Sequence, residues 1–286
     1  MRRKDFLRSG ILGISALGFG KVAKAKVTAS SEIEQVGFEH IPPNEKKTNM
    51  KKVLHRAATR GHANHGWLDT HHTFSFANYR NPERMHFGAL RVLNDDRVAA
   101  GRGFGMHPHD NMEIVSIPLK GNLEHRDNMG NTTIIKEGDV QIMSAGTGVF
   151  HSEMNQRTDQ DVEFLQIWIF PKRRNITPRY DQQTFHTHDR KNTLQTVVSP
   201  ENVEKGIDIN QDAYLTLAEL DSKKYVDYTI RKTGNGVYIF VLEGSVEIAG
   251  ETLERRDGLG VWDTDGVKIA AVSDAEVLLL EVPMEI

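Results

Sequence analysis

From about residue 51 onward, hydrophobic residues occur in short runs separated by clusters of turn-forming residues. The runs are apolar throughout or alternate apolar with polar positions, and turn clusters such as NDD at 94–96 end them. Many short segments with a turn roughly every 8 to 12 residues are typical of a β-sandwich or β-barrel. The 3.6-residue periodicity of long helices is absent. In this half of the chain the runs lie at 87–93, 112–119, 122–126, 132–136, 140–143 and 162–170.

A second series of such runs begins after about residue 192. The stretch MEIVSIPLKGNLEH at 112–125 is similar to VYIFVLEGSVEI at 237–248, because in both a strand is followed by a glycine and then by another strand. A repeat of this kind indicates two similar β-domains in one chain. We therefore predict an all-β protein with one domain at 51–175 and a second at 193–286. Residues 176–192, in a stretch rich in Pro, Arg, Asn and Asp, are predicted to form the linker.

The first 25 residues have the features of a secretory signal peptide. A basic start, RRKDFLR at 2–8, precedes the apolar run ILGISALGFG at 11–20, and AKA at 23–25 fits a cleavage site. The basic segment also resembles a twin-arginine signal, although one extra residue separates the arginine pair from Phe-Leu. We predict export to the periplasm. An ordinary secretory signal, or an amphipathic tail on a cytoplasmic protein, is the alternative. Residues 26–50 are predicted to form a flexible arm.

Composition and charge exclude several classes of protein. The 286 residues are 38% hydrophobic and 26% charged, as in a soluble globular protein. No apolar run approaches the roughly 20 residues that span a bilayer, so no stable membrane insertion is expected. The chain contains no cysteine, which rules out disulfides and thiolate metal sites. The whole-chain charge is −3 and the leader carries a net +5, so the mature protein has a charge of about −8 and lacks the basic footprint of nucleic-acid binding.

Two pairs of potential metal ligands lie in the predicted strands. His107 and His109 are two residues apart and therefore point to one face of a strand, and Glu113 shares their parity. His151 and Glu153 form a second pair with the same spacing, and a barrel can bring the two strands together. Three imidazole nitrogens and one carboxylate oxygen, with open positions, suit Fe(II) and also Mn, Ni, Co or Cu. Calcium and magnesium prefer mostly oxygen ligands.

A weaker interpretation of these histidines also exists. The chain has 13 of them, and HANH at 62–65 and HH at 71–72 show how common they are here. An isolated His-x-His is more often surface or core polar filling than a metal site. The conjunction of two same-face pairs, each in a glycine-rich stretch, favours a metal site.

The same stretches resemble a known family. Residues 101–113 are similar to the first cupin motif, with Gly121 one residue later than usual. Residues 138–155 are similar to the second motif, except that Ser144 replaces the usual Pro and two extra residues precede His151. These departures are those of the pirin family, and the chain is identified as a member over about residues 52–286. Supporting stretches are HANHGWLD (62–69), HTFSFANY (72–79), EHRDNMG (124–130) and IMSAGTGVFHSE (142–153).

The resemblance implies two cupin β-barrels of jelly-roll type, a bicupin, with one mononuclear metal in the N-terminal barrel. The ligands it implies are His107, His109, His151 and Glu153, and the metal it favours is Fe(II). Glu113 would then lie beside the ligands, with Glu113 as the carboxylate ligand kept as an alternative. We expect the C-terminal barrel to be a degenerate cupin without a metal, because no His-x-His pair occurs there.

The resemblance also implies a function. We expect a dioxygenase of the quercetin 2,3-dioxygenase type, in which a flavonol or another phenolic or enediol substrate reacts with O₂ and Glu153 takes the substrate proton. The alternative is an iron-binding, redox-sensing regulatory module that acts through protein partners. His125 and Asp127 are expected to brace a turn or, alternatively, to line the mouth of the pocket. Trp67, Phe74 and Phe76 are expected in the core, with a role in the pocket as the alternative.

Overall fold

The computed structural model describes residues 50–203 and 206–286, and this part of the chain is built from 22 β-strands. Its two short 3₁₀ helices are η1 (Ala57–Thr59) and η2 (Thr187–Arg190). Within this part, no helix has the length and apolar character needed to cross a membrane. The expected leader at 1–25, and the expected arm up to residue 49, lie outside the described residues. The prediction of an all-β fold is confirmed.

The first half of the described chain forms two sheets, which together are called the first barrel. The larger sheet has the strand order β12-β9-β6-β11-β4-β3-β2, and the smaller has the order β5-β10-β7-β8. The strands are β2 (Gly61–Asn64), β3 (Leu68–His72), β4 (Leu90–Val98), β5 (Gly103–His109), β6 (Glu113–Lys120), β7 (Asn122–Asp127), β8 (Thr132–Lys136), β9 (Asp139–Ser144), β10 (Val149–Met154), β11 (Val162–Ile169) and β12 (Arg179–Thr184).

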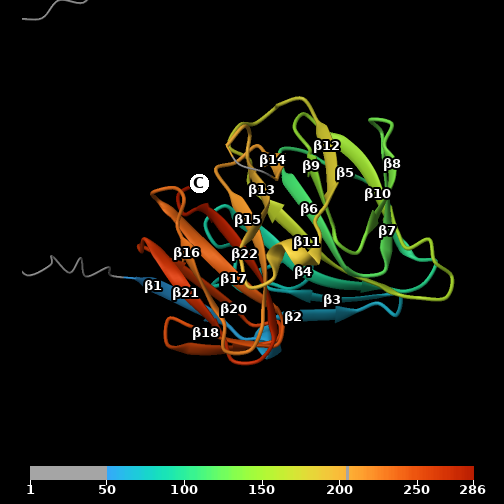
Figure 1. Ribbon diagram of the computed structural model, residues 1–286. Helices are drawn as coiled ribbons and strands as arrows, with labels where there is room; N and C mark the ends of the chain where they lie inside the picture. The colour runs from blue at the N-terminus through green and yellow to red at the C-terminus, as the bar shows by residue number, and fades with distance from the viewer. Residues whose placement is uncertain (1–49, 204–205) are drawn as a thin grey trace, which may run out of the picture. The chain divides into compact units, whose positions relative to one another are not determined.

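The second half, together with β1, forms another two sheets, called the second barrel. Its larger sheet has the order β1-β20-β17-β22-β15-β13-β14 and its smaller sheet the order β16-β21-β18-β19. The four-stranded sheets lie at opposite ends of this part of the molecule (Figure 1). The strands are β1 (Lys51–His55), β13 (Gln195–Pro200), β14 (Ile207–Ile209), β15 (Tyr214–Leu220), β16 (Tyr225–Thr229), β17 (Asn235–Glu243), β18 (Ser245–Ile248), β19 (Glu251–Glu254), β20 (Gly258–Trp262), β21 (Gly266–Ala271) and β22 (Ala275–Pro283).

The strand orders of the two barrels correspond position by position, which confirms the internal repeat. The consecutive strands β6 and β7 occupy the places of β17 and β18, and β5 and β10 occupy those of β16 and β21. Two edge strands lie where the sequence does not place them. β12, in the segment expected as a linker, pairs with β9, and β1, in the expected first domain, pairs with β20 of the second barrel. Both are held by backbone hydrogen bonds at a sheet edge, which need no apolar pattern.

The two large sheets share one hydrophobic core. Alternate residues of β11, such as Leu165 and Ile167, belong to the same buried cluster as Leu278 and Leu280 of β22. In a strand, successive side chains point to opposite faces, so the other residues of each strand point into their own barrel. The faces between the barrels are therefore apolar, and the described residues from 50 onward belong to one compact unit.

The interiors of the two barrels differ in polarity. In the second barrel the inward positions of β17 and β22, such as Ile239 and Leu279, form a continuous apolar cluster. In the first barrel the equivalent strands place the buried polar residues Ser116 and Gln166 inward. Burying polar groups is costly unless they are hydrogen-bonded, so these side chains need a network of hydrogen-bond partners. The network centres on the strands that carry the predicted ligands.

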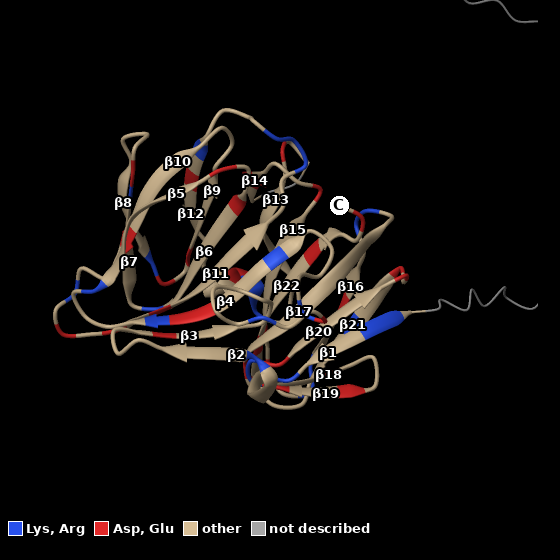
Figure 2. Cartoon of the chain, turned by 180° about the vertical axis from the view of Figure 1, so that it is seen from behind, with Lys and Arg blue, Asp and Glu red and all other residues tan. Residues whose placement is uncertain are grey.

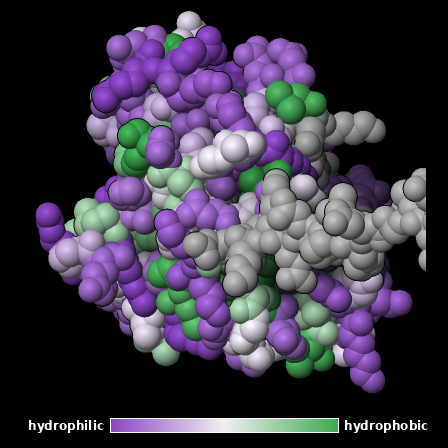
Figure 3. All heavy atoms as spheres, turned by 90° about the vertical axis from the view of Figure 1, so that its left-hand side faces the viewer, coloured by the Kyte–Doolittle hydropathy of each residue, from purple (hydrophilic) through white to green (hydrophobic). Residues whose placement is uncertain are grey.

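The outer surface carries mixed charge and small apolar groups. Basic and acidic positions are distributed over strands and loops of both barrels (Figure 2). On the face drawn in Figure 3, hydrophobic residues form small groups among hydrophilic ones. Candidate functional sites are therefore expected in the polar interior of the first barrel and at individual clusters of side chains.

Candidate metal centre

Neighbouring strands of the small sheet bring three histidines together. β5 carries His107 and His109 on one face, and its antiparallel neighbour β10 places His151 directly opposite His107. The ring centroids are 4.4 Å apart for His107 and His151, and 4.9 Å apart for the other two pairs. One ligand atom from each imidazole lies within 4.8 Å of the others. The structure thus assembles the three predicted imidazoles into one cluster.

Hydrogen bonding leaves lone pairs free in this cluster. The Nδ1 of His107 lies 2.8 Å from the carbonyl oxygen of Gly105, so Nδ1 donates and Nε2 keeps its lone pair. The Nε2 of His151 is buried and has no hydrogen-bond partner among the described residues. An orphaned imidazole nitrogen beside two other imidazoles is costly in a folded protein unless it binds something. A metal ion fits these donors.

The environment keeps two of the rings neutral. Burial, together with the rings of His107 and His125, lowers the pKa of His151 to about 3. Burial, together with His151 and His107, lowers the pKa of His109 to about 4. Because only a neutral imidazole can donate a lone pair to a metal, these shifts favour coordination at neutral pH.

The Glu153 carboxylate is buried beside this cluster but is held by other residues. It accepts hydrogen bonds from Ser116 Oγ at 3.0 Å and from Gln166 Nε2 at 2.8 and 3.0 Å. The 4.8 Å group of histidine nitrogens does not include it. β5 has one more residue than β10 between the His107–His151 and Phe104–Glu153 pairs, which is a β-bulge. The bulge therefore interrupts the regular pairing of β5 with β10 between His151 and Glu153.

Glu113 does not lie with the histidines. It is fully buried on β6, where its Oε2 accepts hydrogen bonds from Ser144 Oγ at 2.7 Å and from the backbone N–H of Asn210 at 3.3 Å. Burial raises the pKa of this carboxyl. β5 ends at His109 and β6 begins at Glu113, so the parity shared in the sequence does not continue across the intervening turn. Glu113 therefore faces the second barrel.

His125 and Asp127 form a buried pair behind His151. The Asp127 carboxylate lies 3.0 Å from His125 Nε2 and accepts bonds from the backbone N–H groups of Met129 and Asn131, so it braces the turn as expected. His125 also lies against the predicted ligand, because its Nδ1 is 3.5 Å from the Nδ1 of His151. The pair thus buttresses the orientation of the His151 ring as well as the turn.

An aromatic wall connects the cluster to a cavity. Trp168 packs edge-on against His109 with ring centroids 4.9 Å apart, and Phe76 packs against Trp168 at 5.3 Å. Phe76 also lines a cavity of about 320 Å³, together with Phe104 and the buried carboxylate of Asp96. Phe74 is buried in the core as predicted, whereas Phe76 belongs to this wall.

The pKa of Asp96 is raised to about 7, mainly by burial. A hydrogen bond from Thr70 lowers this pKa, and the nearby Glu153 carboxylate raises it. The sequence motifs do not predict roles for Ser116, Gln166, Trp168 and Asp96. A polar residue at an inward position of an apolar strand, such as Gln166 in VEFLQIWIF, is the signal that could have found Ser116 and Gln166.

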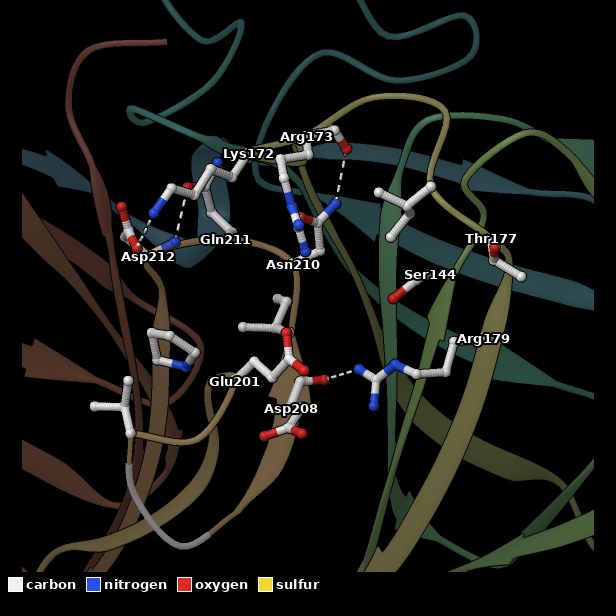
Figure 4. Close-up of a pocket in the computed structure, with 14 residues that line it drawn as sticks. Ser144, Lys172, Arg173, Thr177, Arg179, Glu201, Asp208, Asn210, Gln211 and Asp212 are labelled. Atoms are coloured by element: carbon white, nitrogen blue, oxygen red, sulfur yellow. Dashed lines mark hydrogen bonds and ion pairs between the residues drawn. The ribbon is translucent and has the colours of Figure 1, made fainter.

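A larger cavity of about 690 Å³ contains none of the three histidines. It lies where the two barrels meet and is lined by residues of both (Figure 4). There, Arg179 donates to the backbone carbonyl of Asp208, and Lys172 pairs with Asp212 at 2.8 Å. Its lining contains no histidine, so it offers no imidazole ligand set comparable to the histidine cluster.

The family model for pirin matches residues 53–169, and the model for the quercetinase C-terminal cupin domain matches residues 196–282. The chain is 46% identical over 230 residues to a quercetin 2,3-dioxygenase of Escherichia coli (strain K12), which covers 80% of this chain and 98% of that protein. It is 39% identical over 222 residues to a pirin-like protein of Caulobacter vibrioides, covering 77% and 95%. The crystal structure of the bacterial pirin YhhW from Escherichia coli in complex with nickel(II) matches with a TM-score of 0.77 and 44% identity, covering 82% of this chain and 99% of that one.

The fold and the histidine cluster define a two-barrel cupin protein whose first barrel holds the candidate site. The sequence relationships extend along both barrels. The chain belongs to the pirin family.

Proposed function

We propose that this protein is a metal-dependent dioxygenase of the quercetin 2,3-dioxygenase type, acting on a flavonol or another phenolic or enediol substrate. The observation that carries the proposal is the cluster of His107, His109 and His151, with the orphaned Nε2 of His151 inside it. The name of the relative that is 46% identical over 230 residues supports the same reaction class. The relationship spans both barrels, so the whole scaffold is shared and not only the motif.

We assign His107, His109, His151 and Glu153 as the residues that hold the metal. When bound, the metal would act as a Lewis acid toward a substrate hydroxyl and bring it close to O₂. Fe(II) is the proposed ion, with Mn, Ni, Co and Cu as chemically suitable alternatives. The nickel(II) complex of a relative with 44% identity supports a site for this class of ion.

Glu153 is proposed as the residue that takes the proton of the substrate hydroxyl. A general base must be within hydrogen-bond reach of that proton and must be held in place. The bonds from Ser116 and Gln166 provide this orientation. Proton transfer to Glu153 leaves the substrate oxygen anionic, which makes the ring electron-rich toward O₂.

The cavity lined by Phe76 fits an aromatic substrate better than a small polar one. Phe76 and Phe104 provide flat apolar walls, and Thr70 and Asn94 provide polar groups. A planar phenol can stack on such rings while its hydroxyls meet the polar side. These contacts favour a flavonol-like ring system over a simple sugar.

O₂ consumption tests the proposed reaction directly. The protein would be purified anaerobically, analysed for metal, loaded with Fe(II) and mixed with quercetin and a panel of simpler phenols and enediols. We expect substrate-dependent O₂ uptake that Glu153→Gln eliminates and that Glu124→Gln, at a partly exposed position outside the cluster, preserves. Iron that cycles between oxidation states without any substrate turnover would contradict the dioxygenase and support the regulatory alternative, which acts through a protein partner.

We also propose that the protein is exported and works in the periplasm. The support is the sequence at 1–25 alone, with its basic start, apolar run and Ala-Lys-Ala. Cell fractionation of the wild type beside an Arg2→Lys, Arg3→Lys variant is the test. Full-length wild type in the cytoplasm would overturn export, whereas unchanged export of the variant would remove only the twin-arginine route.

A further inference from the structure

A second group of potential ligands lies on the outer face of the hairpin formed by β2 and β3. The register places His62 directly opposite His71 and Asn64 directly opposite Asp69. These four side chains share one face, because Asp69 and His71 are two residues apart on β3. Thr70 and His72, at the alternate positions, are buried. The group is therefore separate from the cluster of His107, His109 and His151.

The distances within this group suit a metal ion. The Nε2 of His62 lies 2.9 Å from Asp69 Oδ1, and the Nδ1 of His71 lies 3.9 Å from the same oxygen. The two imidazole rings are stacked, with centroids 4.4 Å apart. One ligand atom from each residue lies within 4.8 Å of the others. The side chains of His62 and His71 are 52% and 38% exposed, so an ion can reach them from solvent.

The Asp69 carboxylate is already oriented toward the two rings. Its other oxygen, Oδ2, accepts a hydrogen bond from Asn64 Nδ2 at 3.2 Å and lies 3.4 Å from Arg97. Asn64 is fixed in turn, because its Oδ1 accepts the backbone N–H of Gly66 at 2.8 Å. Outer contacts of this kind orient the ligands of metal sites. Oδ1 is the oxygen near both imidazoles, hydrogen-bonded to His62 Nε2 at 2.9 Å and 3.9 Å from His71 Nδ1.

We propose that His62, His71 and Asp69 form a second, surface site for a divalent transition-metal ion of the Zn²⁺ or Cu²⁺ class. Two imidazole nitrogens and one carboxylate oxygen are a ligand set that these ions accept, with solvent completing the coordination. Calcium and magnesium are disfavoured because they prefer mostly oxygen ligands. An ion at this position links the edge strand β2 to β3. The guanidinium of Arg97 opposes a cation, so the site is expected to bind more weakly than the buried cluster.

Counting bound Zn²⁺ tests this site. The full chain would be equilibrated by dialysis against a buffered excess of free Zn²⁺, and metal per chain would be measured by elemental analysis. We expect the wild type to bind one equivalent more than a His62→Ala, His71→Ala variant. Adding His151→Ala to that variant should remove a further equivalent, because the two sites are independent.

The pair His186 and His188 provides a matched control. These rings are also stacked, with centroids 5.4 Å apart, and His188 also lies beside an aspartate, Asp189. A His186→Ala, His188→Ala variant should bind as much Zn²⁺ as the wild type. Asn64→Leu should keep the site but lower its Zn²⁺ affinity by about tenfold or more. Equal Zn²⁺ binding by the wild type and the correctly folded His62→Ala, His71→Ala variant would overturn the proposal and leave an ordinary surface His–Asp pair.

Discussion

The side-chain amide of Gln166 donates hydrogen bonds to both carboxylate oxygens of Glu153, at 3.0 and 2.8 Å. Gln166 belongs to β11 of the large sheet and Glu153 to β10 of the small one. The contact therefore crosses the interior of the first barrel and ties the proposed carboxylate ligand to the opposite sheet. The contact also gives the buried amide of Gln166 hydrogen-bond partners, in a strand whose other inward residues are apolar.

Replacing Gln166 by leucine is expected to weaken metal binding about ten- to hundredfold. The variant removes both amide bonds, so the Glu153 carboxylate loses the orientation that the opposite sheet provides. Metal affinity would be measured by competition with a chelator. The matched control is Gln156→Leu, since Gln156 also bonds a glutamate, Glu124 at 2.9 Å, but on the exposed surface. Unchanged affinity in Gln166→Leu would show that this contact does not position the ligand.

Removal of His107 or His151 is expected to abolish stoichiometric iron. Either change to alanine leaves two imidazoles, and His151→Ala also removes the buried nitrogen that has no partner among the described residues. Iron per chain would be measured after anaerobic loading with one equivalent of Fe(II). His188→Ala, at a histidine whose side chain is 78% exposed, should bind iron like the wild type. One tightly bound iron per chain in the His151→Ala protein would contradict the ligand assignment.

Asp96 is expected to make stability depend on pH. Burial, mainly, raises the pKa of Asp96 from its ordinary 3.8 to about 7. The folded chain therefore holds this proton more tightly than the unfolded chain, and the native state loses stability as the pH rises from about 4 to about 7. Asp96→Asn should remove this loss, raising the free energy of unfolding above pH 7 by at most about 4 kcal/mol and changing it little near pH 4.

Urea denaturation of the metal-free protein at a series of pH values would measure the Asp96 effect. The control is Asp161→Asn, at a carboxylate whose side chain is 45% exposed. The difference between Asp96→Asn and the wild type should grow through the window between pH 4 and 7 and then level off. A difference that is constant over the whole range would exclude the proposed protonation of Asp96.

The sequence predicts the strands and the histidines because both depend on local periodicity. His107 and His109 share a face as a direct consequence of the two-residue repeat of a strand, and the glycine-rich motif around His151 identifies the partner strand. Gln166 and Trp168 are not predicted, because their roles depend on which strand of the other sheet lies opposite. Which strands face each other across the barrel is set by the tertiary structure. In the sequence, the only sign of it is a polar residue within an apolar run.

Edge strands show the same limit in the fold. β12 reads RYDQQT and β1 reads KKVLH, so neither carries a clear apolar stripe. Each is placed by backbone pairing with a strand far away in the sequence, at the corresponding edge of its large sheet. Domain boundaries drawn from composition alone therefore cut across the actual sheets. The repeat of β6–β7 and β17–β18 is visible because β6 and β17 are buried, mostly apolar strands, each followed by a glycine and then a further strand.

The shared core predicts that the two barrels unfold together. Leu280 is fully buried in the cluster between the barrels, and its neighbour Leu279 is fully buried inside the second barrel. Either leucine changed to alanine should cost about 2–5 kcal/mol, while Val272→Ala, at an exposed position, should cost far less. Because residues of both barrels form one cluster, each variant should still show a single calorimetric transition at a lower temperature. Two resolved transitions, with only the second barrel affected by Leu279→Ala, would show that the barrels are energetically independent.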